Sequence, residues 1–300
     1  MLQPETPIYL ILTCLLCPLA RIDSTNPLVY NLLHMSTSEL TQTQESQATA
    51  YPDAASQEMI DAGVFYGRKK NRTHPKMRQF VLTNRSGIEI INLEKTAEYL
   101  EKALSFIKEK VRNGGSILVV GTEPEAEEAI RGLAERFKLS YVTNRWAGGT
   151  LTNFKIISKR IEYFKKLVSD MAKGALEKYT KKERLGIERE INRLRYLFGG
   201  LENFEKLPDA VLIINAHVHD SAVREAWILK IPVIALANIN TNPAKIGYLV
   251  PGNDKSRKSI QFFLNKVADA IAGGIATRPV VEEKKAEETP ATAVSKKNDK

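Results

Sequence analysis

Residues that could carry out catalysis or bind a metal are few and scattered in this sequence. The only two cysteines, Cys14 and Cys17, have the spacing of half a zinc site, but no second ligand pair follows them. His217, His219 and Asp220 follow a predicted strand and could converge on a metal, although their alternation equally suits a polar loop. No Gly-x-Ser-x-Gly nucleophile elbow occurs. We therefore predict no catalytic residue, no metal site, no cofactor and no small-molecule substrate.

Nucleotide binding would be expected at the turn that follows a predicted strand at residues 117–120. This turn runs from Gly121 to Glu125 as Gly-Thr-Glu-Pro-Glu, and Glu127 and Glu128 come directly after it. It contains neither Gly-x-Gly-x-x-Gly nor Gly-Lys-Ser/Thr. Carboxylates complement a helix dipole but repel a pyrophosphate, so the turn argues against a nucleotide-binding enzyme.

Electrostatic binding of phosphate is better supported, by residues 63–85. The segment has a local charge of +7 and no acidic residue. Its cations are Arg68, Lys69, Lys70, Arg72, Lys76, Arg78 and Arg85, and His74 lies among them. Phe65, Tyr66 and Phe80 interleave with the cations and could stack on unpaired bases, or could simply anchor a solvated loop to the core. We predict that this basic loop binds RNA.

A second candidate RNA contact follows a predicted strand at residues 139–142. Asn144, Arg145, Trp146, Gly148, Gly149, Thr152 and Asn153 form this compact polar and aromatic loop. Trp146 could stack on a base or ribose, but tryptophan is more often a partly buried packing residue.

The overall charge supports a polyanionic partner. The net charge is +9, and residues 63–300 alone carry +15, with 43 basic and 28 acidic residues. Because each neutralised phosphate releases counterions, nucleic acid is the favoured partner, ahead of an anionic membrane surface. A Rossmann-like nucleotide-binding enzyme and a basic peripheral membrane protein are the alternatives.

The elements that must position these residues read as an α/β domain over residues 56–150 and 204–275. Short apolar runs predict strands at 88–91, 117–120, 139–142, 211–214 and 233–236, with a further short strand at 247–250. Helical patterns at 94–112, 123–137, 221–230 and 256–272 lie between most of them. This alternation predicts a parallel, doubly wound sheet.

Residues 151–203 interrupt the alternation and predict an antiparallel helical hairpin. Apolar residues follow coiled-coil spacing from Ile157 to Met171 and again from Ile187 to Leu201. Thr180 and Glu183 form a capping box that would begin the second helix. Either stripe alone equally suits an amphipathic helix on the domain.

The ends of the chain show no core-forming pattern. We expect residues 1–55 to be a disordered leader or the product of a start site placed upstream of Met35, because the apolar run from Ile8 to Ala20 is too short to span a membrane and lacks signal-peptide features. Residues 276–300 are expected to be a disordered tail.

Residues 144–154, Asn-Arg-Trp-Ala-Gly-Gly-Thr-Leu-Thr-Asn-Phe, resemble the signature segment of ribosomal protein S-two of the bacterial small subunit. Further similar segments follow in the family's order, at 62–67, 71–77, 90–96, 207–210, 231–233 and 250–254. The resemblance covers residues 56–274. It departs at Phe65 to Arg68, where the family has histidines, and near Asn215, His217 and His219, where acidic residues are usual.

The resemblance implies a flavodoxin-like (Rossmann-like) parallel sheet with an inserted coiled-coil hairpin. It also implies a structural, non-enzymatic role in the small ribosomal subunit of the cytoplasm. The expected partners are small-subunit ribosomal RNA and neighbouring proteins, among them the mRNA-binding ribosomal protein S-one, which it would help to dock. Carried over by position, the RNA-facing candidates are Arg68, Arg72, Lys76, Arg78, Asn144, Arg145, Asn153 and Lys155.

Overall fold

A computed structural model describes residues 54–174 and 178–278. The expected leader up to residue 53 and the expected tail beyond residue 278 lie outside these described residues. Residues 54 and 55, expected in the leader, instead begin α2 (Ala54–Asp61), and Ala276, expected in the tail, ends the last helix. Within them, no helix has both the length and the apolar composition needed to cross a membrane.

The centre of the fold is a parallel sheet of five strands with the order β5-β4-β6-β7-β8. In chain order the strands are β4 (Ile117–Val120), β5 (Ser140–Val142), β6 (Ala210–Ile214), β7 (Val233–Ala237) and β8 (Tyr248–Pro251). Every residue of β4, β6 and β7 is buried, as expected for strands covered on both faces. This is the flavodoxin-like order, and it confirms the predicted fold class.

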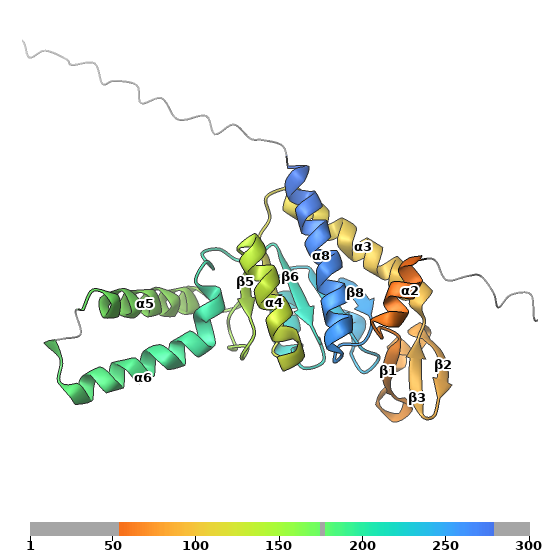
Figure 1. Cartoon of the computed structure of the whole chain (residues 1–300), viewed down its shortest axis with the longest axis horizontal. Helices are drawn as coiled ribbons and strands as arrows, with labels where there is room; N and C mark the ends of the chain where they lie inside the picture. The colour runs from red at the N-terminus through yellow and green to blue at the C-terminus, as the bar shows by residue number, and fades with distance from the viewer. Residues whose placement is uncertain (1–53, 175–177, 279–300) are drawn as a thin grey trace, which may run out of the picture. The chain divides into compact units, whose positions relative to one another are not determined.

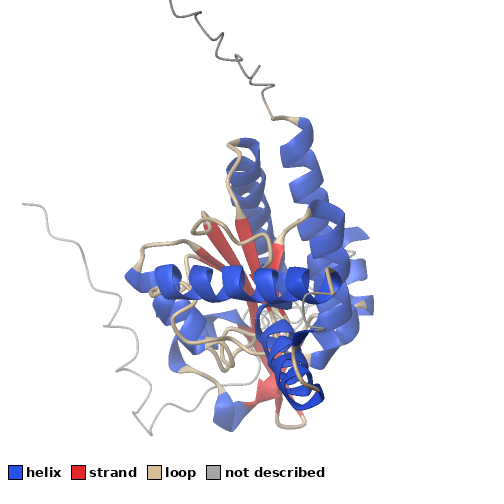
Figure 2. Ribbon diagram, turned by 90° about the vertical axis from the view of Figure 1, so that its left-hand side faces the viewer, coloured by secondary structure: helices blue, strands red, loops and turns tan. Residues whose placement is uncertain are grey.

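Helices lie on both faces of this sheet (Figure 2), and two apolar layers form the core, one on each face. One face packs against α3 (Leu93–Arg112), α4 (Pro124–Phe137) and α8 (Arg257–Ala276). The other face packs against α7 (Asp220–Ile228) and the base of the helical insertion. Alternate residues of one strand serve the two layers, since Val119 belongs to the first and Leu118 to the second.

Residues 88–91 do not belong to the parallel sheet, which corrects the sequence prediction. They form β3 (Ile88–Ile91), the middle strand of a separate antiparallel sheet with β1 (Tyr66–Lys69) and β2 (Val81–Arg85). β2 and β3 are joined through Ser86 and Gly87, which both have positive φ. A Ser-Gly pair in a two-residue loop is typical of a β-hairpin. The sequence prediction gave more weight to the apolar run at residues 88–91 and missed this turn. Residues 63–85, called the basic segment from here on, are therefore not a plain loop, because many of them lie in this small sheet.

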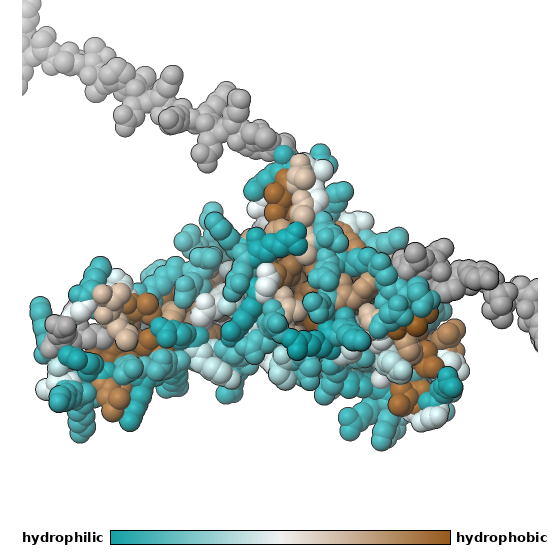
Figure 3. Space-filling model, viewed as in Figure 1, coloured by the Kyte–Doolittle hydropathy of each residue, from teal (hydrophilic) through white to brown (hydrophobic). Residues whose placement is uncertain are grey.

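The insertion forms two helices, α5 (Phe154–Ala172) and α6 (Lys181–Phe198), seen as a hairpin in Figure 1. The capping box at Thr180 is confirmed, with reciprocal hydrogen bonds to Glu183. Ile161, Phe164 and Ile191 are buried, whereas Met171, farther along the predicted seam, is 47% exposed. Figure 3 shows hydrophobic side chains at the surface of this hairpin. A continuous coiled coil thus stays a prediction, as does the division into 56–150, 151–203 and 204–275.

The small antiparallel sheet and the hairpin join opposite edges of the parallel sheet. On the side of β8, the side-chain amide of Asn238, directly after β7, donates to the Tyr66 carbonyl oxygen at 3.4 Å. At the β5 edge, a Cβ atom on Gly200 would lie 2.3 Å from the Tyr141 carbonyl oxygen, so only glycine fits where α6 ends against β5.

Candidate RNA-binding surface

Most cations of the basic segment face solvent without an acidic partner. The exposed set is Lys69, Lys70, Arg72, Lys76, Arg78 and Arg85. They lie at the ends of β1 and β2 and in two 3₁₀-helices, η2 (Lys70–Arg72) and η3 (Pro75–Phe80). None of the ion pairs found among residues 54–174 and 178–278 uses any of them. Met77 and Phe80 are buried and hold η3 to the core, so the charges are displayed on an anchored segment.

Arg68 is placed differently from the other cations. Its Nη2 atom lies 2.7 Å from Oδ1 of Asp254, a side chain with no exposed surface. The Asn238 amide donates to the same oxygen at 3.3 Å. At the neighbouring Gly67, a Cβ atom would lie 2.4 Å from the Glu89 carbonyl oxygen, so the close approach there requires glycine. Arg68 therefore links the small sheet to the end of β8.

The aromatic residues of the segment divide between the two roles considered for them. Phe80 is buried and meets the Tyr99 ring edge to face at 5.1 Å between centroids, which identifies it as an anchor. Tyr66 is 52% exposed and its ring lies 4.2 Å from that of the half-buried Phe65. His74 is half-buried, and its Nδ1 accepts a hydrogen bond from the Lys76 backbone amide at 3.3 Å. Tyr66 is thus the aromatic side chain that offers a ring face to solvent.

The loop of residues 144–155 is organised by Glu225 of α7, which sequence reasoning missed. Glu225 Oε1 accepts from the Trp146 indole N–H at 3.0 Å and from the Gly149 amide at 2.9 Å. Oε2 accepts from the Leu151 amide at 3.0 Å and from the Thr152 amide at 3.3 Å. Burial would raise the pKa of Glu225, but these donated hydrogen bonds stabilise its carboxylate and hold the pKa below the ordinary value.

Glu225 therefore fixes the shape of the loop through hydrogen bonds, and the charged side chains of the loop face solvent. Trp146 is half-buried and packs against the core, which favours the packing role for it. The Asn144 side-chain amide donates to the Tyr196 carbonyl oxygen of α6 at 2.9 Å. Arg145, Asn153 and Lys155 are exposed, and Asn153 lies at the beginning of α5 without a side-chain capping bond. Arg145 and Lys155 are accordingly the cations that this loop offers to a partner.

The turn after β4, where a nucleotide would be expected to bind, is occupied by internal hydrogen bonds. The Thr122 amide donates to Nε2 of His219 at 3.1 Å, and the Asn215 side-chain amide donates to Glu123 at 2.8 Å. Burial disfavours the imidazolium form and lowers the pKa of His219 to about 4. At Gly121, a Cβ atom would lie 2.6 Å from Cδ1 of Ile130, so this glycine permits packing against α4. The Thr122 backbone amide of this turn is therefore hydrogen-bonded within the protein and does not face a site for phosphate.

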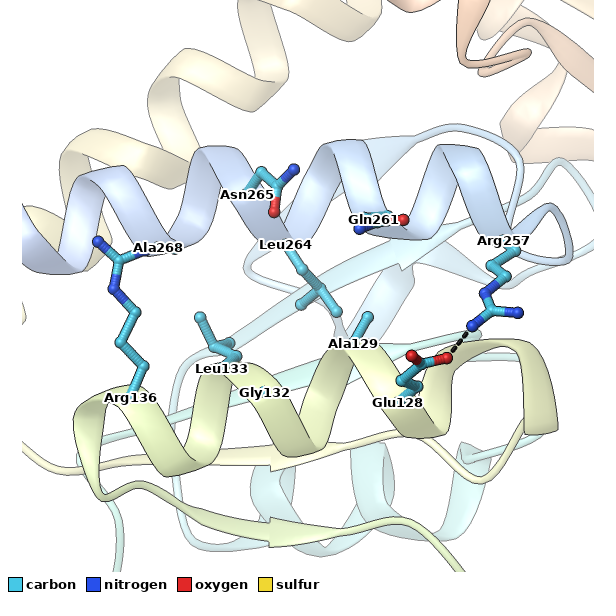
Figure 4. Close-up of a pocket in the computed structure, with 10 residues that line it drawn as sticks. All are labelled: Glu128, Ala129, Gly132, Leu133, Arg136, Arg257, Gln261, Leu264, Asn265 and Ala268. Atoms are coloured by element: carbon cyan, nitrogen blue, oxygen red, sulfur yellow. Dashed lines mark ion pairs between the residues drawn. The ribbon is translucent and has the colours of Figure 1, made fainter.

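Two further features bear on ligand binding. Among the described residues, His217, His219 and Asp220 do not form a group that could hold a metal, and no other His, Cys, Asp or Glu cluster does so. A pocket of about 360 Å³ lies between α4 and α8, where Glu128 pairs with Arg257 at one end (Figure 4). None of the residues predicted to bind RNA lines this pocket.

A flavodoxin-like sheet whose turn after β4 is filled by its own side chains, flanked by exposed cations, defines a basic binding protein of the α/β class. Residues 59–274 match the family model described as ribosomal protein S2. Because that match covers more than half of the sequence, this chain belongs to the ribosomal protein S2 family.

Known relatives agree with this membership. The chain is 40% identical over 228 residues to a Micrococcus luteus protein, with 76% of this chain and 80% of the relative covered. It is 40% identical over 240 residues to a Corynebacterium diphtheriae protein, with 80% and 87% covered. Both relatives are named small ribosomal subunit protein uS2. The expected family is confirmed, and both relatives are named as ribosomal proteins.

Proposed function

We propose that this protein is a structural constituent of the small ribosomal subunit that binds small-subunit ribosomal RNA through two displayed groups of cations. The first group is the exposed set on η2, η3 and the ends of β1 and β2. The second is Arg145 and Lys155 on the loop fixed by Glu225. The cytoplasm is the expected compartment, since the family resemblance implies a place in translating small subunits.

The observation that carries this proposal is the absence of ion-pair partners for the exposed cations among the described residues. Because the segment is anchored, little backbone entropy is lost when its unpaired cations meet phosphate, and each contact releases counterions. The same surface on a membrane protein would need an apolar or lipid anchor to hold it in place. RNA is therefore favoured over a lipid surface.

A second part of the proposal is that the protein helps to dock ribosomal protein S-one. The hairpin supports a protein contact, because Tyr163, Tyr179, Leu185 and Tyr196 on or beside α5 and α6 are each about half exposed. Exposed aromatic side chains are typical of protein interfaces. Replacing Tyr163 and Tyr196 by serine should reduce the amount of S-one retained on purified small subunits, with unchanged incorporation of the protein itself.

The test of RNA binding is a titration of small subunits that lack this protein with the full chain, followed by sedimentation at several salt concentrations. If about six phosphates are contacted, the logarithm of the binding constant should fall with the logarithm of salt concentration with a slope of roughly −4 to −5. Salt-independent association, or persistent absence from the subunit, would contradict the proposal.

A further inference from the structure

A polar cleft lies beside the basic segment and has no role in the function proposed so far. Its volume is about 360 Å³. It brings together His74 from the basic segment, the beginning of α7, and the residues from the end of β7 through another 3₁₀-helix, η6 (Pro243–Lys245). These segments are far apart in sequence and meet at the carboxyl end of the parallel sheet, the edge where doubly wound folds bind ligands.

Two residues that line the cleft carry polar atoms to which the described residues give no hydrogen-bond partner. Asn240 and Thr241 both line it. Oδ1 of Asn240 and Oγ1 of Thr241 are buried and have no hydrogen-bond partner among the described residues, and Thr241 is only 3% exposed. Buried polar atoms are nearly always hydrogen-bonded in folded proteins. Both atoms have almost no solvent exposure in the unliganded cleft, so a ligand that carries donors and acceptors would satisfy them once the Asn240 and Thr241 side chains turn toward it.

The remaining lining supplies an apolar floor, flat side chains and positive charge. Val223 and Ile246 are the larger apolar residues, while His74 and His217 provide rings. Arg224 pairs with Asp220, but Lys245 takes part in none of the ion pairs found in the described part of the chain. Imidazole rings and guanidinium planes are surfaces on which proteins stack unpaired RNA bases, and a free ammonium group binds phosphate.

We propose that this cleft holds one unpaired nucleotide of small-subunit ribosomal RNA. The base packs against the apolar floor and the rings and exchanges hydrogen bonds with Asn240 and Thr241, and its phosphate lies at Lys245. The volume sets the size of the ligand, because roughly 300 Å³ is the lower end of the range for ligand pockets and leaves room for a single nucleotide. This inference rests on the proposed function, since it places one particular contact within the RNA-binding surface.

The experiment adds the full chain to small subunits that lack it and maps the reactivity of each nucleobase by chemical probing. Asn240→Ala removes the base contact, and Lys245→Gln removes the phosphate contact. The matched controls are Asn203→Ala and Lys206→Gln, at exposed positions that precede β6 and so lie at the opposite end of the sheet. Thermal unfolding of each variant checks the fold. If Asn240→Ala does not fold stably, the salt dependence of binding by Lys245→Gln still tests the proposal.

With the wild-type chain we expect one unpaired base to be protected, and with Asn240→Ala that base should become reactive again while affinity falls about tenfold. Lys245→Gln should reduce the magnitude of the salt slope by about one. An unchanged protection map and slope in both variants, with normal wild-type binding, would overturn the cleft assignment and leave the proposed function standing. Saturable binding of free adenosine monophosphate without any protected base would also overturn it. Failure of the wild-type chain to join the subunit would remove the proposed function together with this inference.

Discussion

The Arg68 guanidinium lies 2.7 Å from the carboxylate of Asp254, although the two residues are 186 positions apart in the sequence. Asp254 has no exposed side-chain surface, and Arg68 is 22% exposed. A charge this deeply buried persists only when it is paired. The pair therefore holds the small antiparallel sheet, with its exposed cations, to the end of β8.

We predict that Arg68→Gln lowers the free energy of unfolding by about 3 kcal/mol, because it leaves the Asp254 carboxylate buried without its cation. Denaturant unfolding would measure the change. Lys69→Gln, at the adjacent exposed cation, is the control and should alter stability by less than about 0.5 kcal/mol. Equal effects of the two substitutions would show that the pair has no structural role.

Reversing exposed cations should affect RNA binding and not folding. We expect the triple variant Lys70→Glu, Arg72→Glu and Lys76→Glu to join small subunits at least 100-fold more weakly, since three phosphate contacts become repulsive. Its thermal midpoint should stay close to that of the wild type. Sedimentation with subunits that lack the protein gives the affinity.

The matched control for this variant changes the same charge elsewhere. Arg112, Lys206 and Lys230 are exposed and precede β4, β6 and β7, at the opposite end of the sheet. Reversal of these three should leave subunit binding within a few-fold of the wild type. Similar losses for both triple variants would mean that net charge, and not the basic segment, governs binding.

Stability should decrease in mildly acidic solution through His219. Its folded pKa of about 4 lies below the ordinary value of 6.5, so between these pH values the unfolded chain binds more protons than the folded one. The contribution of neutral His219 to the free energy of unfolding is complete above about pH 6.5. It decreases by up to roughly 1.4 kcal/mol per pH unit as the pH falls toward 4. In the His219→Gln variant, the free energy of unfolding should change less with pH between 4 and 6.5. The same substitution at the exposed His217 is the control. A His219→Gln variant with the full wild-type slope would refute the assignment.

Removal of the Glu225 carboxylate should loosen the loop at residues 144–155. We predict that Glu225→Gln lowers unfolding free energy by about 2 kcal/mol, because an amide N–H₂ then faces N–H donors. The chain has two tryptophans, so a Trp227→Phe background leaves Trp146 as the only one, and its emission should shift to the red. The exposed Glu202→Gln serves for comparison, and a Trp146 spectrum identical in both variants would contradict this role.

The two ends of the hairpin seam should differ in their contribution to stability. Phe164 is 1% exposed and Met171 is 47% exposed. Phe164→Ala should reduce the free energy of unfolding by about 3–5 kcal/mol, and Met171→Ala by less than about 1 kcal/mol. A loss above about 2 kcal/mol for Met171→Ala would instead indicate that α5 and α6 pack as a continuous coiled coil in solution.

The sequence by itself determined the elements whose signals are local. The strand at residues 117–120 has the predicted bounds, because four consecutive apolar residues fit a strand that is buried on both faces. The capping box at Thr180 and Glu183 involves residues three apart and could be read directly. The exposed cations were likewise visible as residue types, since charge is a property of composition.

The tertiary structure alone decided which partner each of several key residues meets. Residues 88–91 looked like a core strand, but only strand pairing shows that they belong to a separate antiparallel sheet. Arg68 resembled its neighbouring cations until the fold placed it beside Asp254, and Glu225 looked like an ordinary helix residue until α7 met the loop at residues 144–155. Local periodicity is set by neighbours in the chain, whereas these contacts join segments that meet only when the layers pack, so no short pattern encodes them.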